Sequence, residues 1–113
     1  MNWKSLEATN QVDKIKDESK QKNVLIFKHS TRCSISAASL DRLERKWDSD
    51  EMGHLEVYFL DLIRYRDVSN YIADTFGVAH QSPQVLVIRD GSSIYDQSHF
   101  GIDYDELRTL EPA

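Results

Sequence analysis

The sequence predicts an α/β fold in which a four-stranded mixed sheet is flanked by helices. Two observations lead to this prediction. Apolar runs of strand length alternate with segments whose apolar residues recur at helical spacing, and a short Asp90-Gly91 turn joins the last two strand-like runs as a hairpin. At 113 residues the chain has the size of one domain with its own core. We therefore expect a single domain over residues 1–113.

The first half of the chain predicts two helices and two strands. Val12 and Ile15 give a polar segment a thin apolar stripe, whereas Val24–Phe27 is a continuous apolar run typical of a strand covered on both faces. Between residues 34 and 47, apolar residues recur near helical spacing with charged residues between them. A second apolar run follows at residues 55–60. The expected elements are a helix Thr9–Ser19, a strand Val24–Phe27, a helix Ser34–Trp47 and a strand Leu55–Leu60.

The second half predicts a helix, a hairpin and a short final helix. Val68, Ile72 and Phe76 share one helical face, and Gly77 stands where a glycine commonly ends a helix. The expected elements are a helix that begins at Asp67 or Ser69 and ends at Phe76, strands Gln84–Ile88 and Ser92–Gln97, and a last helix through Leu110 that Asp103 and Glu106 start as a capping box.

This order of elements restricts how the strands pair. A strand–helix–strand unit crosses over right-handed and pairs its strands in parallel, and the hairpin adds an antiparallel edge. The compact solution is one sheet with helices on both faces. This is the arrangement of the thioredoxin-like fold.

Composition and charge exclude several classes of function. A formal net charge of −5 argues against nucleic acid as the main partner. No apolar run approaches the roughly 20 residues that span a bilayer, and the N-terminus lacks the features of a secretory signal. One cysteine allows neither an internal disulfide nor a cysteine-rich zinc site. We expect a cytoplasmic protein without a membrane partner, a metal site or a bound cofactor.

Cys33 is the candidate catalytic residue. It lies where the first central strand gives way to a helix, and open α/β sheets place their ligand sites outside the carboxyl ends of strands. A helix N-terminus favours a thiolate over a thiol, and Arg32, Lys28 and His29 add positive charge nearby. Many lone cysteines are small buried apolar residues, but this position predicts a nucleophile.

Two further positions belong to the predicted site. Ser36 occupies the place of the second cysteine in a C-x-x-C motif, so the chemistry must use one thiol. Its hydroxyl either donates to the Cys33 thiolate or serves the backbone of the first helical turn, and the sequence leaves both open. Only about 5–6% of X–Pro bonds are cis, but in this fold a cis-proline loop faces the reactive cysteine. We therefore expect Ser82–Pro83 to be cis.

The loop before the last helix is a second candidate binding segment. The last hairpin strand returns there, and the N–H groups of a helix start can bind an anion. His99 either contacts the substrate or is a hydrogen-bonded loop residue, and we leave both open. Phe100 either contacts the substrate or anchors the core, and we favour the core.

The segments Lys28–Ala38, Ser82-Pro83-Gln84, Asp90-Gly91 and Ser98-His99-Phe100 resemble the monothiol bacilliredoxins, in the same order and over nearly the whole chain. The family motif T-C-P-I-S is matched at its cysteine, isoleucine and last serine, whereas Arg32 and Ser34 replace the threonine and the proline. The resemblance implies a thioredoxin fold and removal of bacillithiol from S-bacillithiolated client proteins through Cys33.

The resemblance also implies the reaction partners. Bacillithiol, or a similar low-molecular-weight thiol, is the co-substrate, and a recycling thiol or reductase restores the protein. Because bacillithiol carries malate carboxylates, an anionic group must be recognised. The predicted set is Cys33 and Ser36 for catalysis, with Lys28, His29, Arg32, Ser34, Ser82, Pro83 and His99 for substrate binding.

Two other classes of function fit part of the pattern. Monothiol glutaredoxins that hold an iron–sulfur cluster typically show C-G-F-S and a glycine pair before the last helix, but this chain has Cys33-Ser34-Ile35-Ser36 and only Gly101 there. A non-catalytic adaptor or a redox sensor would share the fold. In these, Cys33 would be incidental, or only a target of thiolation.

Overall fold

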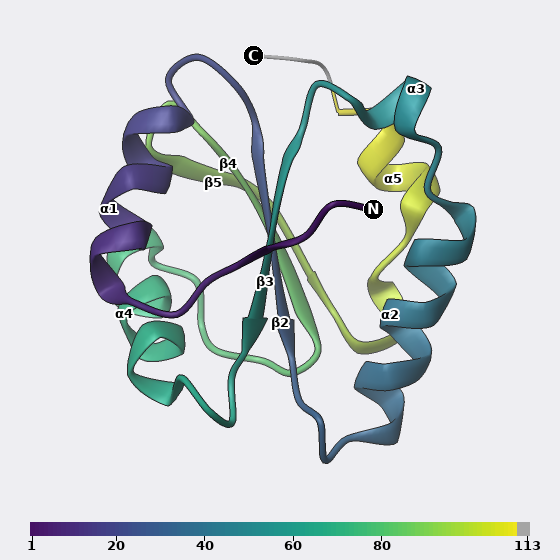
Figure 1. Cartoon of the computed structure of the whole chain (residues 1–113), viewed down its shortest axis with the longest axis horizontal. Helices are drawn as coiled ribbons and strands as arrows, with labels where there is room; N and C mark the ends of the chain where they lie inside the picture. The colour runs from purple at the N-terminus through teal and green to yellow at the C-terminus, as the bar shows by residue number, and fades with distance from the viewer. Residues whose placement is uncertain (111–113) are drawn as a thin grey trace.

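Five strands form one mixed sheet in the order β1-β3-β2-β4-β5 (Figure 1). The computed structural model describes residues 1–110. β1, β3 and β2 are parallel, and β4 and β5 are antiparallel to their neighbours. The elements in chain order are β1 (Lys4–Ser5), α1 (Thr9–Glu18), β2 (Val24–His29), α2 (Ser34–Lys46), α3 (Ser49–Met52), β3 (Glu56–Asp61), α4 (Arg66–Phe76), β4 (Gln84–Arg89), β5 (Ser92–Ser98), the 3₁₀ turn η1 (His99–Gly101) and α5 (Tyr104–Arg108).

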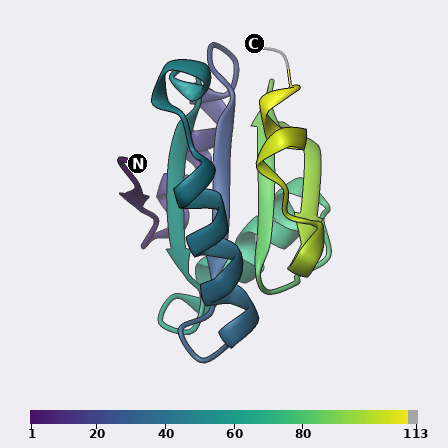
Figure 2. The ribbon, with the colours of Figure 1, turned by 90° about the vertical axis from the view of Figure 1, so that its right-hand side faces the viewer.

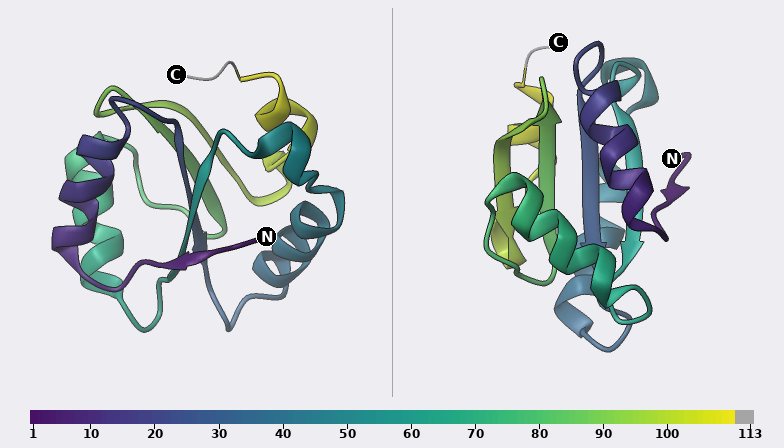
Figure 3. Two further views of the ribbon diagram at one scale, coloured as in Figure 1. Left: turned by 45° about the horizontal axis from the view of Figure 1, so that its top comes forward. Right: turned by 90° about the vertical axis from the view of Figure 1, so that its left-hand side faces the viewer.

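The helices cover both faces of the sheet. Figure 1 shows α1 and α4 on one side of the sheet and α2, α3 and α5 on the other. Figure 2 looks onto the face covered by α2, α3 and α5, and the right panel of Figure 3 looks onto the face covered by α1 and α4. Side chains of β2 alternate between two buried clusters: Val24 and Ile26 pack with α1 and α4, whereas Leu25 and Phe27 pack with α2 and α5. A strand buried on both faces explains the continuous apolar run in the sequence.

The prediction of four strands was wrong by one, because β1 adds a fifth. Lys4 and Ser5 pair in parallel with Tyr58 and Phe59, at the edge of the sheet, and both of their side chains are exposed. Two exposed polar residues give no alternating or continuous apolar pattern. The short helix α3 was also not predicted.

Several predicted boundaries differ from the structure by a few residues. β2 continues past Phe27 through His29. α4 begins at Arg66 after Tyr65, so neither Asp67 nor Ser69 caps it. Asp103 does cap the last helix, and its carboxylate accepts from Asp105 N at 3.0 Å.

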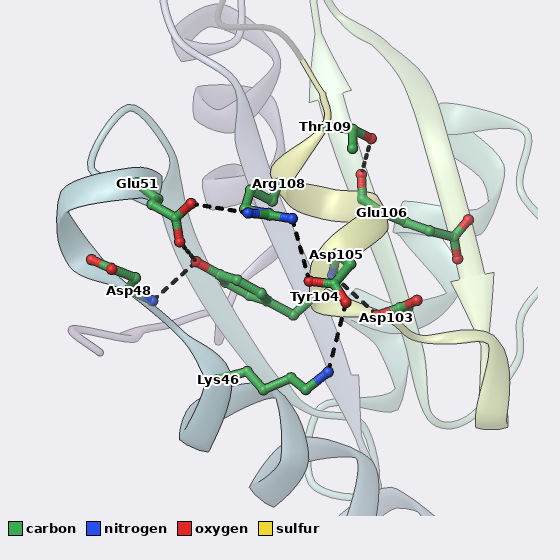
Figure 4. Close-up of polar contacts among 9 residues, drawn as sticks. All are labelled: Lys46, Asp48, Glu51, Asp103, Tyr104, Asp105, Glu106, Arg108 and Thr109. Carbon is green, nitrogen blue, oxygen red and sulfur yellow. Dashed lines mark hydrogen bonds and ion pairs between the residues drawn. The ribbon is translucent and has the colours of Figure 1, made fainter.

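Polar contacts tie the final helix to the far end of α2 and to α3 (Figure 4). The Tyr104 hydroxyl accepts from the backbone N–H of Asp48 at 3.1 Å and donates to Glu51 at 3.1 Å. Arg108 also lies 3.4 Å from Glu51. These contacts hold α5 in place at the end of the molecule remote from the start of α2.

The sheet register brings three chain segments together at one end of the strands. Lys28 at the end of β2 pairs with Gln84 at the start of β4, and Gln84 pairs with Ser98 at the end of β5. The segment leading to α2, the Pro83 loop and η1 therefore lie at this same end of the sheet. Among residues 1–110, no helix combines the length and apolar character needed to cross a membrane.

Candidate functional site

Cys33 lies at the N-terminus of α2, where it is the N-cap residue. Its backbone is extended (φ −114°, ψ 117°), its side chain makes no capping hydrogen bond, and the residue is half-buried. The Cys33 N–H donates to Ser30 O, and its carbonyl accepts from Ala37 N, both at 3.2 Å. The thiol is thus attached to a backbone fixed on both sides. It remains accessible beside the unpaired N–H groups of the first helical turn.

Ser36 is fully buried and binds the backbone of the preceding turn. Its hydroxyl oxygen accepts from Ser30 N at 3.1 Å and lies 2.7 Å from His29 Nδ1. Within the described part of the chain, Ser36 and the Cys33 sulfur make no hydrogen bond. Of the two interpretations left open by the sequence, the geometry supports the backbone role: Ser36 joins the turn before Cys33 to the helix after it.

His29 lies in the layer between the sheet and α2. Its ring centroid is 5.3 Å from that of Phe59 and 6.3 Å from that of Phe27, and the residue is only 8% exposed. Burial lowers the pKa of His29, and the carboxylates of Asp61 and Glu44 oppose this shift only in part. A neutral imidazole bonded to Ser36 does not provide the cationic contact that the sequence suggested.

Lys28 points to the opposite face of the sheet and is fully buried. Its ammonium group donates to the backbone carbonyl of Ser69 in α4 at 3.2 Å. Burial lowers the pKa of Lys28 from 10.5 to about 8. This position does not support the expected contact with an anionic substrate, because the side chain leaves the Cys33 face altogether.

The Ser82–Pro83 bond is cis, as predicted. Pro83 is buried and Ser82 is half-buried. The Pro83 carbonyl accepts from the His99 N–H at 3.0 Å. This bond joins the cis-proline loop to η1, so two of the segments predicted to surround Cys33 are connected directly.

The residues of η1 face solvent. His99 is exposed, and its carbonyl accepts from the Ser39 hydroxyl of α2 at 3.3 Å. The prediction that Phe100 anchors the core was wrong, because its side chain is 73% exposed. Ile102, the next apolar residue, occupies the core instead. Arg32 and Ser34 beside Cys33 are also exposed.

The site therefore contains one accessible thiol, with Arg32 as the adjacent exposed cation and with the cis-proline loop and η1 linked nearby. Its chemistry is that of a single sulfur, because Cys33 is the only cysteine of the sequence. Residues 1–110 contain no group of three or more His, Cys, Asp or Glu side chains placed to hold a metal ion. The contact of Ser36 with the His29 ring was not anticipated, although the spacing of the two residues places them on either side of one turn.

Comparisons with known proteins agree with this arrangement. The family model described as "Monothiol bacilliredoxin BrxC" matches residues 4–107. A solved structure, of a protein provisionally described as an oxidoreductase with a thioredoxin fold, is 30% identical to the chain. The match covers 91% of this chain and 88% of that one, with a TM-score of 0.77.

Two thioredoxins are similar in fold. The Malassezia sympodialis protein is 15% identical, with a TM-score of 0.73 over 95% of this chain and 85% of its own. The Fasciola hepatica protein is 18% identical, with a TM-score of 0.68 over 93% and 92%. At these identities the two thioredoxins establish the fold alone, which is thioredoxin-like as predicted.

Proposed function

Since the chain belongs to the monothiol bacilliredoxin family, we propose that Cys33 removes bacillithiol, or a similar low-molecular-weight thiol, from mixed disulfides of client proteins. The family and its oxidoreductase neighbour indicate a thiol oxidoreductase. The observation that carries the finer proposal is the accessible thiol at the N-terminus of α2, with a serine in the place of a second cysteine.

The reaction is a thiol–disulfide exchange. The Cys33 thiolate attacks the small thiol's sulfur in the client mixed disulfide, and a new S–S bond forms as the client S–S bond breaks. The client sulfur leaves as a thiolate and takes up a proton from water. One disulfide replaces another, so this step needs no electron donor. A second thiol then attacks the adduct sulfur, leaves as a disulfide with the small thiol and restores the Cys33 thiolate.

The proposed binding residues are those that face solvent around the sulfur. Arg32 and the first-turn N–H groups of α2 suit the carboxylates of bacillithiol, and His99 and Ser34 lie on exposed segments nearby. The backbone of Ser82 and Pro83 would align the disulfide. Lys28 and His29 are buried, so we assign them no direct contact with the substrate.

The proposal includes partners and a compartment. The partners are S-bacillithiolated client proteins, the free low-molecular-weight thiol and a recycling thiol or reductase. Release of the adduct needs free thiols, and the cytosol keeps thiols reduced, so we propose a cytoplasmic location.

Transfer of the adduct tests the proposal directly. A client protein carrying one bacillithiol is incubated with the wild-type protein, and the intact masses of both are measured. We expect the client to lose the mass of the small thiol and Cys33 to gain it. Cys33→Ser should leave the client unchanged.

Other outcomes would identify the alternative functions. A wild-type protein that takes the adduct from the small-molecule disulfide, yet never clears a client, would be a redox sensor. A protein that does neither would be an adaptor. A visible cluster absorbance on anaerobically purified protein would instead indicate a glutaredoxin-like iron–sulfur protein.

A further inference from the structure

We propose that Phe100 is an apolar contact for the client protein itself, holding the segment that carries the modified cysteine against the Cys33 site. The inference rests on the proposed function and deepens it, because it assigns the protein half of the substrate to a surface of this chain. The evidence is the exposure of Phe100, its position and the rigidity of its turn.

Phe100 is the most exposed large apolar side chain among residues 1–110, at 73%, compared with 42% for Ile94 and 36% for Met1. Single exposed apolar residues are common and need no special explanation. An exposed phenylalanine is more informative when it lies beside a reactive group, since aromatic side chains dominate the contacts of protein interfaces.

Phe100 lies in η1, which packs against α2, the helix that begins at the Cys33 site. Its neighbour His99 bonds through the backbone to Pro83 and to Ser39 in α2. Ser98 lies two strands away from Lys28 in the sheet register, a distance of roughly 10 Å, and β2 leads from Lys28 directly to Cys33. The two ribbon views agree that η1 lies beside the N-terminal half of α2 (Figures 1 and 2).

The turn holds Phe100 outward. His99 has a φ of +55°, which non-glycine residues seldom adopt, and its N–H and carbonyl are both hydrogen-bonded. Gly101 follows, and a Cβ at that position would collide with the side-chain oxygen of Gln97. The two hydrogen bonds of His99 fix the backbone that carries Phe100 to the Pro83 loop and to α2.

The two halves of the substrate, the small thiol and the client protein, require different kinds of contact. The small thiol is polar and anionic, so hydrogen-bond donors and cations recognise it, and a phenyl ring provides neither. An apolar side chain of the client near the modified cysteine is the complementary partner for Phe100. The contact should therefore affect protein substrates and leave small disulfides unaffected.

The test compares Phe100→Ser with Ile94→Ser, which removes another exposed apolar side chain from β5, four residues or roughly 13 Å from Ser98 along the strand. Each variant is assayed on a bacillithiolated client protein and on the symmetric small-molecule disulfide of bacillithiol. For Phe100→Ser we expect kcat/KM on the client to fall about three- to tenfold, mainly through KM, as partial burial of one aromatic ring would give. Its rate on the small disulfide, and both rates of Ile94→Ser, should stay within about twofold of wild type.

Two results would overturn the inference while leaving the proposed function intact. One is an unchanged rate of Phe100→Ser on the client. The other is an equal loss on both substrates, which would indicate that the substitution disturbs Cys33. A Phe100-dependent dimer in sedimentation experiments would also overturn it, because a second copy of the chain would then cover the ring. Failure of the wild-type protein on both substrates would instead refute the proposed function.

Discussion

Lys28 and His29 are neighbours in β2, yet their side chains lie on opposite faces of the sheet. His29 packs near Phe59 and bonds to Ser36 on the side of α2, whereas Lys28 donates to Ser69 on the side of α4. Successive residues of a strand point to opposite faces. The cluster of basic residues before Cys33 in the sequence is therefore divided by the fold, and Arg32 is the member that stays exposed.

The buried Lys28 leads to a prediction about stability. Its charged form is desolvated in the folded state, where its pKa is about 8, compared with 10.5 as the unperturbed value. Below pH 8 the lysine is charged in both states, and the folded state carries the full penalty. Between pH 8 and 10.5 the unfolded chain holds the proton and the folded chain does not, so wild-type stability should rise with pH through this window.

Lys28→Met should therefore raise the free energy of unfolding at pH 7 by about 1–3 kcal/mol, because an unpaired buried charge is replaced by a side chain of similar shape. The neighbouring His80, whose own pKa is lowered by burial and by Lys28 and Arg66, should titrate more normally in the variant. Urea unfolding at pH 7 and pH 10 measures the effect, which should shrink at the higher pH. Lys14→Met, at an exposed position, is the control. A loss of stability in Lys28→Met would contradict the prediction.

Single residues of the site could be predicted from the sequence where the order of strands and helices alone fixes their position. Cys33 follows a strand and precedes a helix, and Pro83 precedes the next strand in the sheet, so both could be assigned. The contacts of Lys28 and Phe100 could not. In a continuous apolar run both faces are covered, so no pattern shows that a lysine at its end is buried. Nothing in the local sequence shows that Ile102, and not Phe100, enters the core.

At the scale of elements, one hydroxyl connects the end of β2 to the start of α2. Ser36 Oγ accepts from Ser30 N and contacts His29 Nδ1, and all three residues are buried. The turn that carries Arg32 and precedes Cys33 is thereby held between the end of β2 and the first turn of α2. The helix start and the strand end should then behave as one unit.

Ser36→Ala should lower the free energy of unfolding by about 1–3 kcal/mol, because it leaves the buried N–H of Ser30 and a buried imidazole nitrogen without a partner. Urea denaturation monitored by circular dichroism measures this. The matched control is Ser34→Ala, two residues earlier in the same helix and exposed, for which a change within about 0.5 kcal/mol is expected. Equal effects of the two substitutions would argue against the bridging role of Ser36.

Most elements could be predicted because their apolar residues repeat with the period of a helix or form strand-length runs. α1, α2, β4 and β5 lie close to their predicted bounds. β1 and α3 have two and four residues, too few for any repeat to appear. The start of α4 was misplaced because Tyr65, which precedes the helix, is not one of the residue types that usually cap helices.

At the scale of the whole molecule, Trp3 connects the N-terminal edge to both the sheet and a helix. Its ring packs edge-on against Phe27 at 6.0 Å and Phe59 at 5.9 Å, and its indole N–H donates to Glu44 of α2 at 3.3 Å. The short strand β1 alone would hold this edge weakly. The aromatic contacts join the residue before β1 to β2 and β3, and the hydrogen bond joins it to α2.

Trp3→Ala should therefore lower the free energy of unfolding by about 1–3 kcal/mol, less than a fully buried tryptophan because Trp3 is only half-buried. Thermal unfolding followed at 222 nm is a suitable measurement, since it does not depend on tryptophan emission. Trp3→Phe keeps the ring packing and should retain most of the stability. If Trp3→Ala matched wild type, the N-terminal edge would be dispensable for the fold.

Ser36 in place of a second cysteine has a kinetic consequence for the proposed cycle. An adduct on Cys33 has no neighbouring thiol to expel it, because the sequence contains no other sulfhydryl. Release then depends on collision with a molecule from outside, and its rate should scale with the supply of that molecule. In a cell short of reductant, such a protein would stall in its loaded form, so the loaded fraction would follow the reducing capacity of its surroundings.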